Sequence, residues 1–447
     1  MVATEWQLAD DGEEKRARRY ASWLRPAGVE FAGNEAEQAH HARVTRLSDA
    51  FSLRTPDRVP VRTNVGFYPA KWAGITTREA MYEPQKAGEA WLRFNRHFQP
   101  DAMVSPLFAA LPGRAFETLD YRLYHWPGHG VPDNVGYQYN EAEYMLAEEY
   151  DHLIEDPTDF LLRVYLPRIS GAYEGFSRLG SLYGMVEMPF ATAHMRTWAA
   201  PELRVSFERL AEAGRQVDDW LREIVPHVRR IHADGFPPFF GGSSLAPFDF
   251  IGDSLRGTRE IFLDVYREPE RLLAACDRLA PLMVRWVVGQ STPDTSPGIF
   301  MPLHKGADGF MSQEQFDTFY WPSLKAVILG LIDEGFTPFL FAEGRYGSRL
   351  EAISDLPPGK TVWLFDQTDM GRAKETVGRV ACIQGNVPLS LLHTGTPEEV
   401  MAYCEDLIDK AGQGGGFILD IGAVADSARE ENVLAMIRTA KEYGVYR

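Results

Sequence analysis

The 447-residue sequence predicts an α/β fold in which parallel strands form one barrel. From Arg58 onward, short apolar runs alternate with longer segments whose apolar residues recur at helical spacing, a pattern typical of successive βα units. No linker rich in Gly, Ser or Pro interrupts this series. One barrel is therefore favoured over two domains, and α/β barrels with insertions often reach this length.

Residues 1–50 predict a helical extension, and residues 51–447 predict the barrel. The extension is rich in Glu, Arg and Ala, and Tyr20, Trp23 and Leu24 are spaced as on one face of a helix. A frayed, solvated tail is the alternative. The segment lacks the apolar core of a signal peptide, and no run in the chain is long enough to span a bilayer. We therefore expect a cytoplasmic protein without membrane segments.

The first half of the chain gives the weaker strand pattern. Strands are expected at residues 59–67, 101–107 and 180–188, and a long amphipathic helix at 201–233. Aromatic residues in Gly/Pro-rich surroundings, namely Phe67, Tyr68, Phe239, Phe240, Phe248 and Phe250, are interpreted as loop residues. They would line an apolar pocket or form core beneath a long loop, and both alternatives stay open.

The second half gives the clearer pattern. Strands are expected at 298–303, 337–342, 361–365, 379–383 and 416–419, with a helix at 313–334. Ser312 with Gln315 resembles a capping box that opens this helix, and Thr396 before Pro397 predicts another helix start. Cys382 within a strand is interpreted as a small buried apolar residue.

Each of these later strands ends at polar side chains. Because the carboxyl ends of barrel strands converge on one pocket, we expect a ring of polar groups there. Its members are His304, Lys305, Asp308, Glu343, Arg345, Tyr346, Asp366, Asp369, Gln384 and Asn386. Such a ring could polarise a leaving oxygen or hold a hard cation.

Charge and cysteine content exclude some classes of partner. The net charge of -17, with Lys and Arg scattered, argues against nucleic acid and anionic membranes. The three cysteines are widely spaced and form no CxxC pair, so a reducing compartment is expected rather than a disulfide framework.

Several motifs together resemble the uroporphyrinogen decarboxylase superfamily. They are 57–61 (DRVPV), 383–388 (IQGNVP), 395–400 (GTPEEV), 415–419 (GGFIL) and 431–436 (ENVLAM), with weaker similarity at 255–257 and 316–322. The resemblance covers most of the chain after residue 50. It implies a (β/α)8 TIM barrel with its site at the carboxyl ends of the strands, in agreement with the strand pattern.

The resemblance offers two branches. Porphyrinogen decarboxylases carry an arginine-bearing segment that holds the substrate's carboxylates, whereas residues 64–69 here read NVGFYP and only Arg62 precedes them. Corrinoid-dependent methyltransferases bind zinc through His-x-Cys and a later Cys, but those positions fall on Phe341, Glu343 and Ala423. Activity on a porphyrinogen is therefore not expected, and the thiol-alkylating reaction of the Cys-rich zinc site is in doubt.

The site residues implied are His304, Glu343 and Asp366 as catalytic groups. His304 and Glu343 would also be the ligands if zinc or another divalent metal binds. The alternatives are a hydrogen-bonded loop histidine, a salt bridge of Glu343 with Arg345 or Arg349, and a solvated Asp366. The substrate-binding candidates are Lys305, Arg345, Tyr346, Gln384, Asn386, His194 and Tyr68, where Gln384 and Asn386 could equally satisfy backbone at a turn.

Three functions remain open from the sequence. The leading one is transfer of a methyl group from a small O-, N- or S-methylated compound to the corrinoid of a separate protein, since the chain lacks the Asp-x-His-x-x-Gly pattern of a cobalamin site. The second is a decarboxylase or lyase of a small acid held by Arg345, Lys305 or Arg62. The third is a non-catalytic barrel subunit of a methyltransferase complex. The expected partners are the substrate, a corrinoid-binding protein and a second copy in a homodimer.

Overall fold

The structure is a computed structural model that describes residues 11–292 and 296–446. Six parallel strands form its main sheet, in the order β4-β5-β6-β7-β8-β9. Their bounds are β4 Gly242–Ser243, β5 Gly298–Leu303, β6 Thr337–Ala342, β7 Val362–Phe365, β8 Cys382–Val387 and β9 Phe417–Ile421. Four of the five strands expected in the second half of the chain are confirmed. The strand expected at 379–383 instead runs over Cys382–Val387, because Val377–Arg379 forms a 3-10 turn before it.

Two extended segments close this sheet into a ring. Residues 59–65 run parallel to β9 through the bridges Val61–Leu419 and Val65–Ala425. The Asp101 N–H then donates to the Val61 carbonyl at 2.9 Å, and the Met103 N–H donates to the Pro237 carbonyl, just before β4, at 2.8 Å. The six strands and the two extended segments together make the eight strand positions of a barrel, in the order 59–65, 101–104, 237–243 and β5 to β9. The predicted (β/α)8 TIM barrel is therefore confirmed.

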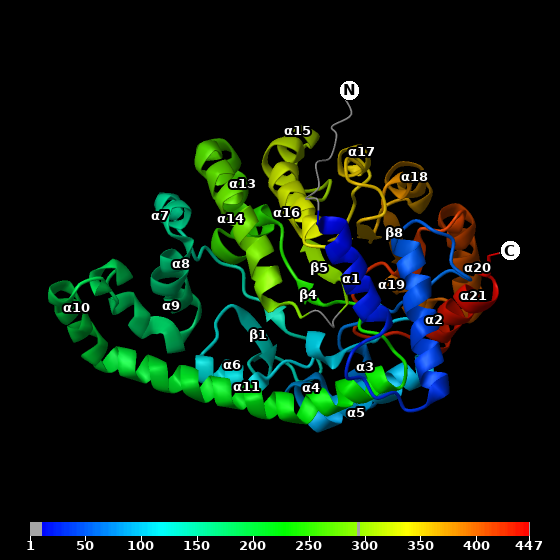
Figure 1. Ribbon diagram of the computed structural model, residues 1–447, viewed down its shortest axis with the longest axis horizontal. Coiled ribbons are helices and arrows are strands. Elements are labelled where there is room, and N and C mark those ends of the chain that lie inside the picture. The colour runs from blue at the N-terminus through cyan, green and yellow to red at the C-terminus, as the bar shows by residue number, and fades with distance from the viewer. Residues whose placement is uncertain (1–10, 293–295, 447) are drawn as a thin grey trace.

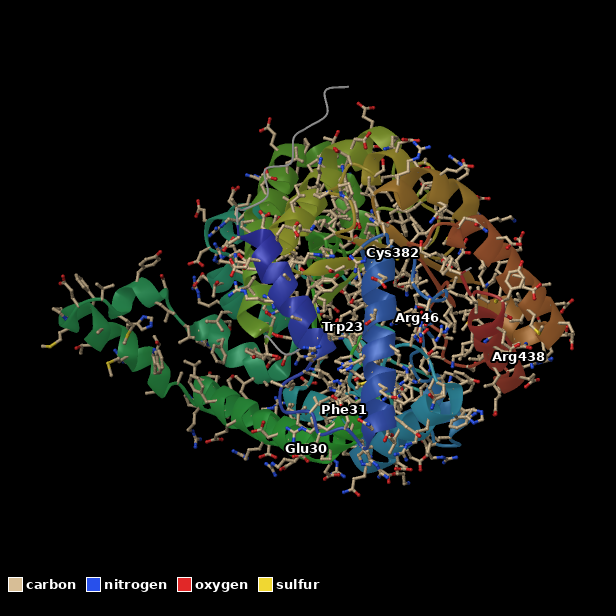
Figure 2. The ribbon with its side chains drawn as sticks, turned by 45° about the vertical axis from the view of Figure 1, so that its right-hand side comes forward. Trp23, Glu30, Phe31, Arg46, Cys382 and Arg438 are labelled. Carbon is tan, nitrogen blue, oxygen red and sulfur yellow. The ribbon has the colours of Figure 1, made fainter. Side chains whose placement is uncertain are left out.

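The helical extension covers the amino ends of the strands. Helices α1 (Gly12–Leu24) and α2 (Asn34–Phe51) lie across the barrel in Figures 1 and 2. Trp23 stacks on Phe51, whose ring lies 5.0 Å from that of Phe339 on β6. Cys382 belongs to the same buried cluster, which confirms its interpretation as a small apolar residue. This apolar plug leaves the carboxyl ends of the strands as the open end of the barrel.

Helices surround the barrel, and Figure 1 shows them on its outside. The main ones are α5 Pro84–Phe98, α11 Pro201–Ala233, α13 Thr258–Arg267, α14 Pro269–Gln290, α16 Trp321–Asp333, α18 Met370–Thr376, α20 Pro397–Leu407 and α21 Glu430–Glu442. The helix predicted at 313–334 runs through α15 (Gln313–Gln315), a π-helical turn and α16. The capping box predicted at Ser312 forms, and Thr396 is the N-cap of α20 as predicted, where it also forms a capping box with Glu399.

A long insertion between the second barrel strand (101–104) and α11 departs from the prediction. It contains helix α6 (Gly113–Leu119), a small sheet of β1 (Tyr124–Pro127), β2 (Gly130–Val131) and β3 (Gln138–Tyr139), and several short helical segments. The strand expected at 180–188 is wrong, because this stretch forms a 3-10 turn (Leu182–Met185) and the start of α10 (Met188–Met195). An apolar run alone does not distinguish strand from helix, and here no neighbouring strand pairs with it.

The sequence analysis missed the third barrel strand (237–243), because its sequence is typical of a loop. Pro237 and Pro238 cannot donate ladder hydrogen bonds, and only two residues of β4 pair regularly with β5. Separately, among the described residues no helix is both long and apolar enough to cross a membrane.

A buried carboxylate joins the first two barrel strands (59–65 and 101–104) to α2. Asp101 is 1% exposed and accepts hydrogen bonds from Arg46 at 2.8 Å, from Arg58 at 2.7 Å and from the Val61 N–H at 2.8 Å. Burial alone would raise the pKa of Asp101, but the two guanidinium groups lower it below its ordinary value of 3.8. Its stabilising contribution is therefore present above that ordinary value and is lost as the pH falls.

We expect Asp101→Asn to lower the free energy of unfolding by about 3–5 kcal/mol, because it leaves Arg58 without its carboxylate partner and Arg46 with Asp57 alone. Urea unfolding followed by circular dichroism measures this. The control is Asp49→Asn, whose partner Arg54 is exposed; it should cost less than about 1 kcal/mol. Equal effects of the two variants would show that Asp101 does not hold the ring closed.

Candidate active site

Three predicted residues lie side by side at the open end of the barrel. In the sheet register, Leu303 pairs with Ala342 and Ala342 pairs with Phe365, so the residues that follow these three positions are neighbours. They are His304, Glu343 and Asp366. The His304 Nε2 lies 3.6 Å from Glu343 Oε1, and the charge of Glu343 acts on Asp366.

The His304 imidazole is held on its other side by an acid that sequence reasoning missed. Its Nδ1 lies 2.5 Å from Asp253 Oδ2, in a π-helical turn (Phe250–Leu255) that follows β4. The imidazole thus lies between two carboxylates, Asp253 and Glu343. The interpretation of Glu343 as a salt-bridge partner of Arg349 fails, because Arg349 is directed to Asp308 instead.

This arrangement favours the protonated imidazole. Burial would lower the pKa of His304, but hydrogen bonds to Asp253 and Glu343 and the charges of Asp253 and Asp249 outweigh it and raise the pKa to about 11. The ring side chain is 36% exposed, so solvent still reaches it. At neutral pH the site therefore carries a cation that can also donate a proton.

Asp249 is a second acid that the sequence analysis missed. It is fully buried and accepts from the His304 N–H at 3.0 Å, the Lys305 N–H at 2.9 Å and the Tyr320 hydroxyl at 2.6 Å. Burial, and then the charge of Asp253, raise its pKa to about 6. Its position within an apolar run was the available signal, because a carboxylate there is costly unless bound.

Asp366 has partial shielding from solvent. Its Oδ2 accepts from the Gly344 N–H at 3.1 Å, while burial raises its pKa above the ordinary 3.8 against that hydrogen bond. The Glu343 side chain is 42% exposed. The side chains of Glu343 and Asp366 therefore lie at the open end of the barrel rather than in its core.

The predicted substrate-binding residues are mostly engaged in the protein. Lys305 Nζ lies 3.1 Å from Asp253 Oδ1 and donates to Thr258. Tyr346 is buried and donates to the Leu303 carbonyl at 3.4 Å. Asn386 donates to the carbonyls of Asp366 and Thr368, so it satisfies backbone at a turn. Arg345 is exposed at the mouth.

Two predicted residues lie away from this cluster. His194 is on α10 in the insertion, where its ring packs near Trp198. Tyr68 is 3% exposed, and its ring packs against Phe94 and Phe98 between the outer helices. The structure therefore does not bring His194 or Tyr68 together with the other predicted substrate-binding residues.

A polar layer lies deeper inside the barrel. Gln384 Nε2 donates to Asp420 Oδ2 at 2.6 Å, and Arg62 lies 3.1 Å from the same carboxylate oxygen. Gln384 is fully buried and its Oε1 has no hydrogen-bond partner. His304, Glu343 and Asp366 follow the carboxyl ends of their strands, whereas Gln384 lies deeper in the barrel, so a single cavity lined by all four residues stays a prediction.

An internal cavity of about 500 Å³ opens beside this layer. Its aromatic lining consists of Phe108, Tyr137, Phe239, Phe240 and Phe300, and Arg62 and Asn64 supply polar groups. The Arg62 guanidinium lies 4.6 Å and 5.0 Å from the ring centres of Phe239 and Phe240. Phe239 and Phe240 therefore line a pocket, whereas Phe248 is buried core.

The donor set was tested against a zinc site. Catalytic zinc takes three protein ligands, and within residues 11–292 and 296–446 no cluster of three His, Cys, Asp or Glu side chains has metal-binding geometry. His304 and Glu343 lie close enough to share an ion, which would have to displace the proton of the imidazole. The residues do not fit a three-ligand zinc, and a two-ligand metal at this pair stays a prediction.

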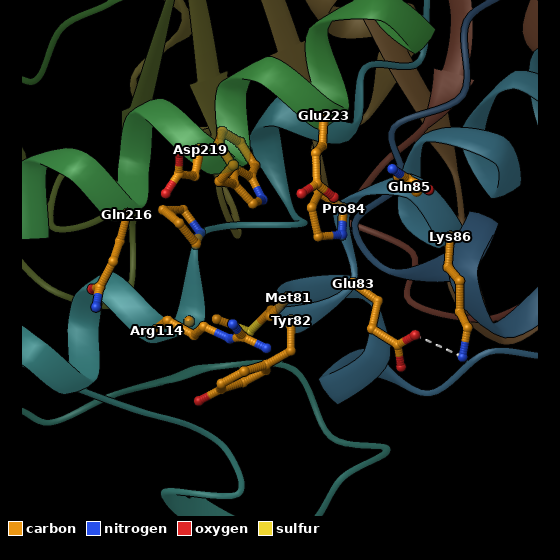
Figure 3. A pocket seen from close by; sticks show the side chains of 13 residues that line it. Met81, Tyr82, Glu83, Pro84, Gln85, Lys86, Arg114, Gln216, Asp219 and Glu223 are labelled. Carbon is orange, nitrogen blue, oxygen red and sulfur yellow. Dashed lines mark ion pairs between the residues drawn. The ribbon is translucent and has the colours of Figure 1, made fainter.

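A second cavity, of about 490 Å³, lies among the outer helices (Figure 3). It is an open groove between α5, α6 and α11, with Arg114, Asp219 and Glu223 on its walls. Glu83 and Lys86 at its rim form an ion pair at 2.9 Å. The groove is distinct from the mouth of the barrel, and none of the predicted site residues lines it.

The pH dependence of stability tests the His304 arrangement. Because the folded-state pKa of His304 is raised, its contribution is fully present below the ordinary value of 6.5 and is lost as the pH rises through about 11. Asp253→Asn should remove much of it, so the stability difference from wild type should be largest near pH 6.5 and should shrink toward pH 11. Chemical unfolding across this range measures it.

The control for that experiment is Asp151→Asn, which breaks an exposed pair with Arg271. Its stability difference from wild type should stay small and nearly constant over the same range. A difference for Asp253→Asn that is equally independent of pH would contradict the assigned proton on His304.

Comparison with known proteins agrees with this geometry. The uroporphyrinogen decarboxylase (URO-D) family model matches residues 209–443, more than half of the chain. Uroporphyrinogen decarboxylases of Cellvibrio japonicus and Saccharophagus degradans are 26% and 24% identical over 230 and 232 residues. These matches cover 50% of this chain and 63% and 64% of those proteins, so the chain spans less than two thirds of their length.

A solved structure extends the comparison to nearly the whole fold. A methyltransferase from Methanosarcina mazei superposes with a TM-score of 0.56 at 14% sequence identity, covering 89% of this chain and 98% of that one. At this identity the likeness concerns the barrel alone. With the barrel formed and the family model matched over its larger part, the chain belongs to the uroporphyrinogen decarboxylase family.

Proposed function

We propose that this chain is a methyltransferase that moves a methyl group from a small methylated compound to the corrinoid of a separate protein. The observation that carries the proposal is the His304 imidazole, held between Asp253 and Glu343 at the mouth of the barrel. Removal of a methyl group from an O- or N-methyl donor needs a proton or a positive charge at the leaving atom. His304 offers both.

We place the donor in the aromatic cavity that Arg62 lines, and the size of this cavity argues for a small donor. A cavity of about 500 Å³ suits a compact ligand, and its lining combines aromatic rings with the basic residues Arg62, Arg229 and His232. A corrin ring would not fit there beside a donor. This supports the expectation that the corrinoid reaches the mouth on a partner protein.

The same residues argue against a porphyrinogen with many carboxylates. The mouth carries the acids Asp253, Glu343 and Asp366, and Asp249 is buried behind them. Arg62 is already paired with Asp420. A polyanionic substrate would therefore meet like charges, whereas a neutral or singly charged donor would not.

In the proposed step, the donor's leaving atom lies against His304 Nε2 and Glu343. A Co(I) corrinoid on the partner protein would be the methyl acceptor and would contribute the electron pair of the new bond to the methyl carbon. As the bond from that carbon to the leaving atom breaks, its electron pair stays on the leaving atom and the proton of His304 moves there. Asp253 keeps the ring oriented, and Glu343 stabilises the cation before transfer.

A decarboxylase of a small acid is the second candidate. It is favoured by the curated relatives, which are uroporphyrinogen decarboxylases. It is also favoured by Arg62, which lines the cavity and binds Asp420 through one nitrogen only, so that the rest of its guanidinium group could bind one carboxylate. Release of CO2 without methyl transfer would favour it.

We expect Glu343→Gln to lower the rate of methyl transfer by about 100-fold or more, because it removes the charge that holds the proton on His304 Nε2. The assay follows the absorbance of free Co(I) cobalamin with a panel of methyl ethers, methylamines and methyl thioethers. Metal content is measured on the same preparations.

The matched control is Glu351→Gln on the exposed face of α17 (Leu350–Ile353), which should keep full activity. A Glu343→Gln protein that loses activity together with a bound metal would assign the carboxylate to metal binding. Full activity and unchanged metal content in that variant would refute the mechanism.

A further inference from the structure

The aromatic cavity that Arg62 lines differs in charge from the rest of the molecule. The chain holds 63 Asp and Glu residues against 46 Lys and Arg residues, and acids gather at the open end of the barrel. Of the residues that the structure describes, however, no Asp or Glu lines this cavity, whereas Arg62, Arg229 and His232 do. A cavity with basic walls in an acidic protein favours an anionic ligand.

Two hydrogen-bond donors inside the cavity have no partner in the protein. Asn64 is 6% exposed and Thr63 is 2% exposed, so both are more than nine-tenths buried. Both line the cavity, and neither Asn64 Nδ2 nor Thr63 Oγ1 has a hydrogen-bond partner among the described residues. An unpaired buried donor destabilises the folded protein. The oxygen atoms of a ligand would satisfy these donors.

Arg62 has further donors beside them. It binds Asp420 through one nitrogen only, at 3.1 Å, and its side chain is 13% exposed. Asp420 also accepts hydrogen bonds from the Gln384 side chain and from the Asn64 N–H. Its charge therefore does not depend on the arginine alone. The remaining guanidinium N–H groups can bind a second carboxylate.

Aromatic rings form much of the remaining wall. The ring centres of Phe239 and Phe240 lie 4.8 Å apart, and that of Phe300 lies 5.0 Å from that of Phe240. Phe108 meets Phe240 edge to face at 5.6 Å. Aromatic rings prefer edge-to-face and offset contacts with one another, so a planar aromatic ligand suits this wall.

We propose that this cavity binds an aromatic acid with a single carboxylate, which Arg62, Asn64 and Thr63 hold while its ring lies among the phenylalanines. This assigns the class of the methyl donor, and to that extent it rests on the methyl transfer proposed above. The donor is an aromatic acid that carries its methyl group on a ring substituent. The cavity volume of about 500 Å³ accommodates a ligand of this size.

Isothermal titration calorimetry of the purified full-length protein tests the carboxylate site with benzoate, benzamide and acetate. We expect benzoate to bind about 10-fold or more tightly than benzamide, which has nearly the same shape without the charge, because hydrogen bonds to an ionised acceptor are the stronger ones. Acetate, which lacks the ring, should bind more weakly than benzoate by a similar factor. Equal affinities for benzoate and benzamide would overturn the proposal.

The variant Asn64→Leu separates ligand binding from folding. It keeps the size of the side chain and removes a donor that the protein leaves unpaired, so the free energy of unfolding should stay the same or rise. Benzoate affinity should nevertheless fall by about 10-fold. The control is Asn34→Leu in the exposed first turn of α2, which should leave benzoate affinity unchanged. A loss of stability in Asn64→Leu, or an unchanged benzoate affinity, would assign Asn64 to the fold and overturn the proposal.

Methyl transfer distinguishes this proposal from the proposed function. With 4-methoxybenzoate as donor, transfer to free Co(I) cobalamin should have a kcat/KM about 10-fold or more above that with anisole, which is the same ether without a carboxylate. Benzoate binding without methyl transfer from any donor would support the carboxylate site and contradict the methyltransferase proposal. Transfer from anisole by a protein that does not bind benzoate would support the methyltransferase and overturn the aromatic acid.

Discussion

The site depends on one constraint, which is the closure of the barrel between its first two strands. Residues 59–65 and 101–104 form almost no regular ladder, and the buried carboxylate of Asp101, bound by Arg46 and Arg58, ties them together. Closure brings the carboxyl ends of all eight strands together at one end of the barrel. It also turns Arg62 and Asp420 toward each other inside the barrel, where they form the polar floor beneath the candidate site.

The reactive groups at the mouth are arranged by strand register and by one turn. Parallel pairing puts His304, Glu343 and Asp366 at the same level. The π-helical turn after β4 then supplies Asp253, and Asp249 fixes the backbone of His304 and Lys305. The result is a cation between two acids, with a small aromatic cavity nearby. This combination suits protonation of a leaving atom on a compact donor better than binding of a polycarboxylate.

The sequence could predict the parts of this fold that local pattern determines. The strands ending at His304, Glu343 and Asp366 are apolar runs that stop at a polar residue, and such runs identify buried parallel strands. The strand at 237–243 could not be predicted, because its prolines are typical of a loop. Residues 180–188 were wrongly predicted as a strand, because their apolar pattern belongs to an exposed helical segment. Asp253 and Asp249 could not be assigned from the sequence, since their closeness to His304 depends on a turn about 50 residues away along the chain.

The protonation state of His304 is the most direct test of the central claim that an imidazolium lies at the mouth of the barrel. Nitrogen-15 NMR of the labelled protein distinguishes the charged ring from its neutral tautomers, and His304→Gln identifies the signal. The account predicts a ring that stays charged throughout the neutral range and loses its proton only near pH 11. A His304 signal that titrates near the ordinary value of 6.5 would contradict it.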